Sequence, residues 1–323
     1  MLKFKDGKFK ILAISDIHGV TDFDKRICPA LGKLLDDVKP DFVFVLGDIF
    51  WDPQNDSYEG MKSFCDAFFA EIEKRNIYWS YVFGNHDSNE KSAYDQRPIY
   101  AQYEHCLYEN SPEGVHGYSN YVLPVYNEAG DDIVYNIWAL DTHDNVSDYC
   151  KYIGIPRETK WEHECTHPLS LRGECGGYDT LRFSQLMWYW NKSVELENKA
   201  GHKIPGLLGL HIPIPEYSLI LRNTAHLYFD GISRENVGTG PINSGLFNCI
   251  LERGDIKTIV AGHDHINDYT GKYYGVTLTY DGGLSYNGYC HDDIRGGRVF
   301  EIDENDAWNI RTYMARVSLD DNV

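Results

Sequence analysis

Short apolar runs alternate with amphipathic segments in the first third of the chain. The runs at residues 11–14, 41–48 and 77–83 are largely aliphatic or aromatic, which is typical of buried strands. Between them, apolar side chains in residues 25–38 and 59–75 recur three to four positions apart, as on a helix that packs along one face. This order of strand, helix, strand, helix and strand predicts βαβ units in a parallel sheet.

The rest of the chain continues this pattern less regularly. Helical spacing returns in residues 180–198 and 244–253, whereas residues 142–180 lack periodicity and are interpreted as a long inserted loop. Further strands are expected at residues 118–125, 133–141, 204–210, 256–261, 276–280, 297–302 and 308–315. The last three of these are expected to pair antiparallel at the end of the chain. No internal repeat or linker interrupts the sequence, so we predict a single domain over residues 1–323.

The predicted strands end in side chains that can bind a metal ion. Asp16 and His18 follow the first strand two positions apart, and therefore point to the same side of an extended chain. Similar residue types follow the later strands, at Asp48, Asn85, His86, His211, His263 and His265. A single Gly-Asp pair is commonly a turn, and a single His is commonly a surface residue. The recurrence of such residues at strand ends, where functional groups of parallel sheets gather, favours a metal centre.

The types of ligand narrow the choice of metal. Carboxylates, imidazoles and one amide oxygen suit Mn²⁺, Fe or Zn²⁺, and their number suits two ions. We therefore expect two divalent or trivalent metal ions, with their identity left open.

Charge and composition limit the partners. The chain of 323 residues has a formal net charge of −19 and a pI near 5.0, which argues against a nucleic-acid partner. The 8 Cys are scattered, as in a protein with reduced thiols. The N-terminus lacks the features of a secretory signal, and no stretch approaches the ~20 apolar residues of a membrane span. We expect a cytoplasmic protein with no membrane partner.

Taken together, these motifs resemble a known family. The blocks Asp16-Ile-His18, Gly47-Asp48, Gly84-Asn85-His86-Asp87, His211 and Gly262-His263-Asp264-His265 are similar to the five-block signature of the calcineurin-like metallophosphoesterases. The resemblance extends over residues 9–302. It implies an α/β (α+β) fold in which two mixed β-sheets form a sandwich flanked by α-helices.

The resemblance also implies roles for individual residues. One metal ion would be held by Asp16, His18 and His265, the other by Asn85, His211 and His263, with Asp48 bridging the two. The imidazole of His86 would give a proton to the leaving alkoxide or stabilise charge on the phosphoryl group. Asp87 would orient that imidazole.

The C-terminal blocks narrow the resemblance to a branch. Residues 215–217, 243–247, 262–268 and 282–289 look like the purple-acid-phosphatase-like branch. Purple enzymes carry an iron-binding tyrosine three residues after the bridging aspartate, where this chain has Trp51. We therefore predict a colourless protein.

The function implied by this resemblance is a metal-dependent phosphoric ester hydrolase. Our first choice is a phosphomonoesterase in which a metal-bridging hydroxide attacks phosphorus in line. The substrate would be a small phosphate ester or a phosphoprotein. A phosphodiesterase acting on cyclic nucleotides or other diesters is an alternative, and a non-catalytic scaffold of the same fold is another.

Weaker patterns leave further alternatives open. Arg295 is a candidate contact to a substrate phosphate or a solvated side chain, and Tyr286 either walls the pocket or packs. Within the insert, residues 150–175 contain Cys150, His163, Cys165, His167 and Cys175, which form either an additional zinc site or a loop with incidental thiols.

Overall fold

The fold is described from a computed structural model of the chain. The description covers residues 1–20, 22–51, 57–87, 95–145, 152, 154, 177–223 and 227–319.

The larger of two sheets is mixed, with parallel and antiparallel strand pairs. Among the described residues it contains 8 strands in the order β1 (Leu2–Lys3), β5 (Tyr121–Tyr126), β6 (Ile133–Ala139), β7 (Gly206–Leu210), β9 (Ile256–Ala261), β11 (Val276–Tyr280), β10 (Thr270–Tyr273) and β8 (Phe229–Asp230). Strands β6, β7, β9 and β11 are mutually parallel, so their carboxyl ends lie at one edge of the sheet.

The smaller sheet is also mixed. Its 5 strands in the described residues follow the order β13 (Arg311–Arg316), β12 (Gly296–Asp303), β2 (Lys8–Ile14), β3 (Phe42–Val45) and β4 (Tyr78–Tyr81). Strands β2, β3 and β4 are parallel, whereas β12 runs antiparallel to β2 and to β13. The predicted βαβ order of the first third is therefore confirmed.

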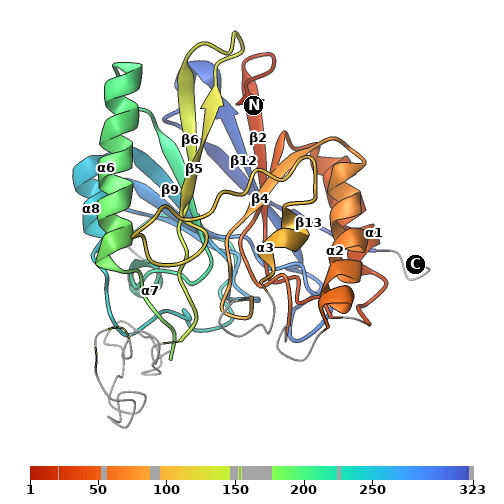
Figure 1. Cartoon of the computed structure of the whole chain (residues 1–323). Helices are drawn as coiled ribbons and strands as arrows, with labels where there is room; N and C mark the ends of the chain where they lie inside the picture. The colour runs from red at the N-terminus through yellow and green to blue at the C-terminus, as the bar shows by residue number, and fades with distance from the viewer. Residues whose placement is uncertain are drawn as a thin grey trace.

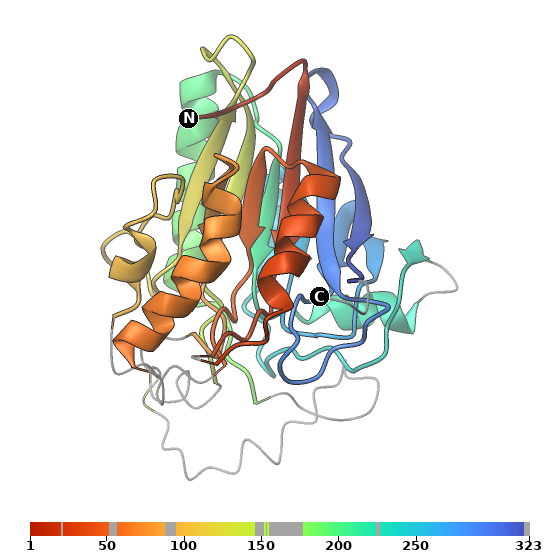
Figure 2. The same ribbon diagram turned by 90° about the vertical axis from the view of Figure 1, so that its right-hand side faces the viewer.

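Helices cover the outer face of each sheet (Figures 1 and 2). The described helices are α1 (Ile27–Val38), α2 (Tyr58–Glu73), α3 (Arg97–Tyr100), α6 (Phe183–Ala200), α7 (Glu216–Arg222) and α8 (Leu246–Arg253), with a short 3-10 turn at Glu304–Asp306. Helices α1 and α2 pack on the smaller sheet, and α6 and α8 pack on the larger one. The expected sandwich of two mixed sheets flanked by helices is confirmed.

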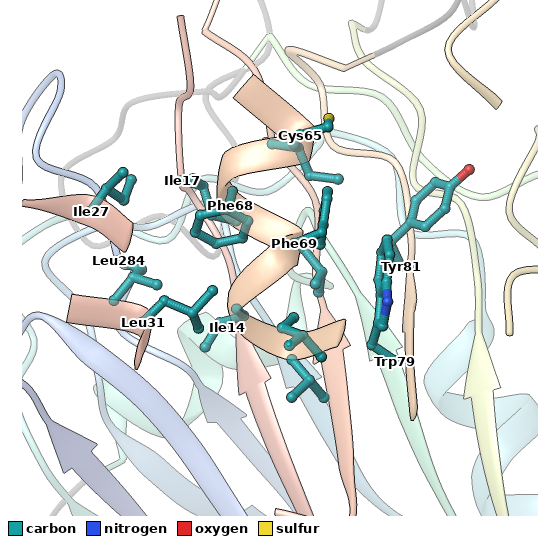
Figure 3. Close-up of a cluster of buried hydrophobic side chains, with 14 of the residues drawn as sticks. Ile14, Ile17, Ile27, Leu31, Cys65, Phe68, Phe69, Trp79, Tyr81 and Leu284 are labelled. Atoms are coloured by element: carbon teal, nitrogen blue, oxygen red, sulfur yellow. The ribbon is translucent and has the colours of Figure 1, made fainter. Parts of the chain in front are cut away.

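The core has one layer between the sheets and one layer under each helical pair. Between the sheets, Phe44 of β3 and Phe300 of β12 pack against residues of the larger sheet such as Val260. Under α2, the ring of Phe69 stacks on Trp79 of β4 with centroids 4.0 Å apart, and Figure 3 shows Phe68 on the side of Ile27. These apolar layers fix the relative positions of the strand ends.

The predicted elements differ from the structure mainly at the short strands. The short strands β1, β8 and β10 and the short helices α3 and α7 were not expected, because so few residues give no readable periodicity. The expectation of an antiparallel finish is correct for β12 and β13, but β11 pairs parallel with β9 and antiparallel with β10. Most of the insert at residues 142–180 lies outside the described residues.

No described helix combines the length and apolarity needed to cross a membrane.

Candidate metal centre

The parallel strands of both sheets bring the predicted ligands to one end of the sandwich. In the smaller sheet, Asp16 and His18 follow β2, Asp48 follows β3, and Asn85 follows β4. In the larger sheet, His211 follows β7, and His263 and His265 follow β9. All of these side chains are buried, and the carboxylate and imidazole atoms among them form overlapping groups that could hold metal ions.

The first group contains Asp16, His18 and His265. The Nε2 atoms of the two histidines lie 2.9 Å apart, and Oδ1 of Asp16 lies 3.3 Å from Nε2 of His265 and 3.7 Å from Nε2 of His18. Two ligand atoms at ordinary metal–ligand distances of ~2.1 Å from one ion are ~3.0–3.4 Å apart at tetrahedral or octahedral angles. The separations in this group are therefore close to those of ligands that share one ion.

The second group is built around His211. Its Nε2 atom lies 3.0 Å from Oδ1 of Asn85, 3.3 Å from Nδ1 of His263 and 3.3 Å from Oδ2 of Asp48. The same Oδ2 atom of Asp48 is 3.8 Å from Nε2 of His18, in the first group. Asp48 thus stands between the two groups, a position that suits the bridging role implied by the family resemblance.

Backbone carbonyl groups fix two of the histidines in the tautomer that can bind a metal ion through Nε2. Nδ1 of His211 lies 2.7 Å from the carbonyl oxygen of Leu46, and Nδ1 of His265 lies 2.7 Å from that of Tyr289. A carbonyl oxygen only accepts hydrogen bonds, so each Nδ1 atom carries the proton. The lone pair of each Nε2 atom in the neutral ring then faces the centre, as metal ligands require.

The backbone at the site is strained. Asp16, His18, Asp48 and His263 have positive φ angles of 51°, 50°, 51° and 75°. Such conformations are uncommon for residues other than glycine and cluster at functional sites. Close packing at glycines supports this arrangement, since a Cβ atom at Gly84 would lie 2.1 Å from Oδ1 of Asp48. A side chain at position 84 would therefore displace Asp48, which gives a steric reason for the glycine of the Gly-Asn-His-Asp motif.

Without metal, this cluster would bind protons. Burial opposes a charged ring at His211, but the adjacent Asp48 carboxylate outweighs it and raises the pKa of His211 to about 10. Likewise, despite burial, Asp16 raises the pKa of His265 to about 9. Burial lowers the pKa of His18 to about 4 and that of His263 to about 3. The ligands thus form a mixed set of charged and neutral rings.

The donor set fits the two metal ions that the sequence suggests. Oδ1 of Asp16 is buried and has no hydrogen-bond partner among the described residues, although it faces two imidazole nitrogens. A buried carboxylate oxygen is costly unless a cation compensates it, which the protonated His265 ring does without metal and a metal ion would do when bound. Carboxylate, imidazole and amide ligands match Mn²⁺, Fe and Zn²⁺ and do not distinguish between them.

His86 lies at the more open side of this cluster. Its side chain is 33% exposed, and its Nε2 atom lies 4.0 Å from Oδ2 of Asp48. The backbone N–H of His86 donates to Oδ1 of Asp48, with 2.8 Å between the heavy atoms. His86 therefore holds the proposed bridging carboxylate through its backbone N–H and places its imidazole beside that carboxylate.

The role expected for Asp87 is wrong. Its carboxylate is buried and accepts hydrogen bonds from the backbone N–H groups of Phe50 and Gly84 at 2.9 and 3.1 Å. The imidazole of His86 is instead held by the carbonyl oxygen of Trp51, 2.7 Å from Nδ1. Asp87 therefore fastens the loops after β3 and β4 together and does not orient the ring directly.

The two candidate substrate contacts near the C-terminus pack against each other. Arg295 is buried, its Nε donates to the carbonyl oxygen of Ser285 at 2.8 Å, and its Nη1 pairs with Asp292. The ring of Tyr286 lies between the guanidinium groups of Arg295 and Arg26, at 4.0 and 4.5 Å. These contacts favour packing for Tyr286 and argue against both readings of Arg295, as a phosphate ligand and as a solvated side chain.

Several residues to which the sequence analysis gave no role support the ligands. Ser15 lies between Asp16 and Asp281, 2.7 Å from Oδ1 of the latter. Asp264 accepts a hydrogen bond from the hydroxyl of Tyr280 at 2.5 Å. In the sequence, only their positions directly beside predicted ligands could have pointed to Ser15 and Asp264.

Aromatic rings flank the centre. The ring of Tyr289 stacks on His265 with centroids 4.2 Å apart, and the edge of Tyr178 meets His263 at 4.2 Å. Trp51 stacks on His86 and is 39% exposed. The candidate zinc ligands Cys150, His163, Cys165, His167 and Cys175 lie outside the described residues.

Comparison with protein families gives a match over most of the chain. Residues 9–267 match the model of the calcineurin-like phosphoesterase family. Two similar proteins of Arabidopsis thaliana are named "Probable inactive purple acid phosphatase 14" and "Probable inactive purple acid phosphatase 29". The first is 29% identical over 88% of this chain and 72% of its own length, and the second is 27% identical over 93% and 78%.

Other similar proteins are a yeast phosphatase and two solved structures. "Phosphatase DCR2" of Saccharomyces cerevisiae is 25% identical over 82% of this chain and 45% of its own length. The crystal structure of a dimetal phosphatase from Danio rerio has a TM-score of 0.56 with 13% identity, and covers 95% of this chain and 98% of that one. GAP50, described as the anchor in the inner membrane complex of Plasmodium, has a TM-score of 0.50 with 11% identity, and covers 98% and 91%. At these identities the structural matches show the fold alone.

Proposed function

The chain belongs to the calcineurin-like phosphoesterase family, and we propose that it is an active phosphoric monoester hydrolase with two metal ions. Our proposal assigns one ion to Asp16, His18 and His265 and the other to Asn85, His211 and His263. Asp48 would contact both. The substrate would be a small phosphate ester or a phosphoprotein.

One observation carries the proposal. Oδ2 of Asp48 lies 3.3 Å from Nε2 of His211, 3.8 Å from Nε2 of His18 and 4.0 Å from Nε2 of His86. A carboxylate shared by two ligand groups, with a partly exposed imidazole beside it, combines the parts that phosphoryl transfer needs. When bound, the metal ions would hold the phosphoryl oxygens and lower the pKa of a water molecule.

The residues of the chain would do the remaining work. Asp16 and Asp48 supply negative charge that offsets the ions, and the histidines held by Leu46 and Tyr289 orient their lone pairs toward the centre. His86 would transfer a proton through Nε2 to the leaving oxygen, because Nδ1 is committed to the carbonyl oxygen of Trp51. The exposed side of His86 leaves room for a leaving group.

Two of the relatives are named as probably inactive proteins, which makes activity the point to test. This chain has carboxylate, amide and imidazole side chains at every predicted ligand position, and it has His86. Those residues support catalysis over a scaffold role. The acidic chain, at −19, also favours small or weakly charged substrates over long polyanions.

The decisive experiment compares a chromogenic phosphate monoester with its diester analogue. Chelator-treated protein is assayed with and without added Mn²⁺, and bound metal is quantified in the same samples. We expect Mn²⁺-dependent hydrolysis that is faster for the monoester. Faster hydrolysis of the diester would make the protein a phosphodiesterase. No hydrolysis of either compound by protein that verifiably holds metal would contradict the proposal and favour a scaffold.

A further inference from the structure

A groove far from the metal centre collects positive charge in this acidic chain. It lies where β9, β10 and β11 of the larger sheet meet the start of β13 in the smaller sheet, and its volume is about 450 Å³. This size is within the range of small-molecule sites. Among the residues that the structure describes, the lining includes Lys257, Lys272 and Arg311 and no acidic side chain.

The floor of the groove is a row of polar side chains across three strands. Thr258 of β9 is directly opposite Thr277 of β11, and Thr277 is directly opposite Lys272 of β10. Residues opposite each other in neighbouring strands project to the same face of a sheet. Two hydroxyl groups and an ammonium group therefore line one side of the groove at successive strand spacings.

The opposite wall carries a guanidinium group and an indole. The side chain of Arg311 is 76% exposed, and Trp308 is 39% exposed. The ammonium group of Lys257 lies 5.6 Å from the centre of the Trp308 ring. These groups supply charge, hydrogen-bond donors and a flat apolar surface within one groove.

The two lysines are not neutralised by acidic neighbours. Neither Lys257 nor Lys272 forms an ion pair with a carboxylate in the part of the chain that the structure describes, whereas Arg311 pairs with Glu301 at 3.1 Å. Three cationic side chains thus meet in one groove of a chain with a net charge of −19. Local potential is set by charges within the ~8 Å Debye length at physiological salt, so the groove can attract an anion.

We propose that this groove binds a phosphate-bearing small molecule. Ammonium, guanidinium and hydroxyl donors suit phosphate oxygens, and the exposed ring of Trp308 offers a stacking surface for an organic group. A long polyanion is less suitable, because it would extend beyond the groove over a strongly acidic chain. Free phosphate and a phosphorylated metabolite share this chemistry and are separated by the experiment below.

This site is distinct from the metal centre. Lys257 is near the start of β9, whereas His263 follows its end, and six residues of extended chain span ~20 Å. The proposal therefore does not depend on the hydrolase activity.

Calorimetric titration of the metal-loaded full chain tests the groove with two probes, inorganic phosphate and phenylphosphonate, which has no hydrolysable ester. The variant Lys257→Gln/Lys272→Gln removes two charges from the groove. The control Lys62→Gln/Lys74→Gln removes two lysines that pair with Asp66 and Glu71 on α2 and its end. Monoester hydrolysis, which the metal centre would perform, is measured for each protein and is expected to be the same for the groove variant and the control.

We expect a binding event that the groove variant weakens by ~5-fold or more and the control does not, the range for losing two partly exposed charge partners. Tighter binding of phenylphosphonate, abolished by Trp308→Ala, would identify an organic phosphate as the ligand. Equal binding of both probes would identify free phosphate. Unchanged binding by the groove variant would overturn the proposal. Tighter binding of a hexaglutamate peptide than of either probe would also overturn it, in favour of an acidic peptide partner.

Discussion

Nδ1 of His86 lies 2.7 Å from the carbonyl oxygen of Trp51, and the two rings stack with centroids 5.1 Å apart. The carbonyl fixes the proton of the neutral ring on Nδ1, and the indole limits rotation of the imidazole. Nε2 of the ring then faces Oδ2 of Asp48, 4.0 Å away, which is the orientation that the proposed proton transfer by His86 requires. A main-chain oxygen thus orients this imidazole, as carboxylates often do for histidines at functional sites.

Replacing His86 with Ala is expected to slow turnover by ~10²–10⁴, the usual contribution of a general acid or base. Metal content should remain near that of the wild-type protein, because the ligand set assigned above does not include this imidazole. Steady-state rates with the chromogenic monoester and metal analysis of the same sample provide the two measurements.

His202→Ala is the matched control for this variant, because His202 is exposed and its Nε2 atom faces Asp132 at 3.2 Å. An unchanged rate in the His86 variant would remove this residue from the mechanism. A parallel loss of metal would show that it acts on the ions and not on the leaving group.

Gly84→Ala is expected to damage the metal centre without adding or removing a ligand. A Cβ atom at this position would lie 2.1 Å from Oδ1 and 2.4 Å from the backbone nitrogen of Asp48. The carboxylate must therefore move from its place between the two ligand groups. We expect metal affinity to fall by ~10-fold or more, as for other changes that displace a ligand indirectly.

Gly177→Ala is the control for the glycine variant, because the nearest atom to its added Cβ would be Nδ2 of Asn145 at 4.0 Å. Metal titration of both variants, monitored by competition with a chromogenic chelator, measures the difference. Wild-type affinity in Gly84→Ala would show that Asp48 can shift without consequence and would contradict its bridging role.

The sequence predicts best those helices and strands whose own residues show a clear hydrophobic pattern. Helix α2 and strand β9 lie close to their expected bounds, because a continuous apolar face or run is visible without knowledge of any neighbour. The strand β8 of two residues was not predicted, because it exists only through its pairing with β10. Similarly, the parallel pairing of β11 depends on β9, which lies 15 or more residues earlier.

A similar division applies to the candidate site. Asp48 and His211 can be recognised in the sequence as candidate ligands, because metal chemistry restricts the possible residue types. The support of His86 by Trp51 is not readable, because a backbone carbonyl has the same chemistry at every position. The packing of Arg295 against Tyr286 could not be predicted either, because the sequence does not show whether an arginine side chain is buried or solvated.

Metal binding is expected to release protons and to strengthen as the pH rises. The pKa values of about 10 for His211 and about 9 for His265 lie above 7, so both rings are protonated at pH 7 in the metal-free protein. A ring that binds metal through Nε2 must lose that proton, so loading both ions at pH 7 should release about two protons. The affinity should therefore fall steadily as the pH is lowered.

Calorimetric titrations with Mn²⁺ in buffers of different ionisation enthalpy count these protons. The variant His211→Ala should release about one proton fewer than the wild-type protein, whereas His202→Ala should release the same number. Identical heats in all buffers would contradict the assignment of His211 and His265 as ligands that are charged before metal binds.

The iron-loaded protein is expected to be colourless. Purple enzymes owe their absorption in the green to a tyrosine that binds ferric iron, at the position held here by Trp51. An indole ring has an N–H donor and no oxygen to offer, and this ring stacks on His86. Absorption spectra of protein reconstituted with ferric iron test the expectation. A green absorption band in the wild-type protein would contradict it. Trp51→Tyr supplies a phenol at the same position, so a band confined to this variant would show that the side chain at position 51 determines the colour.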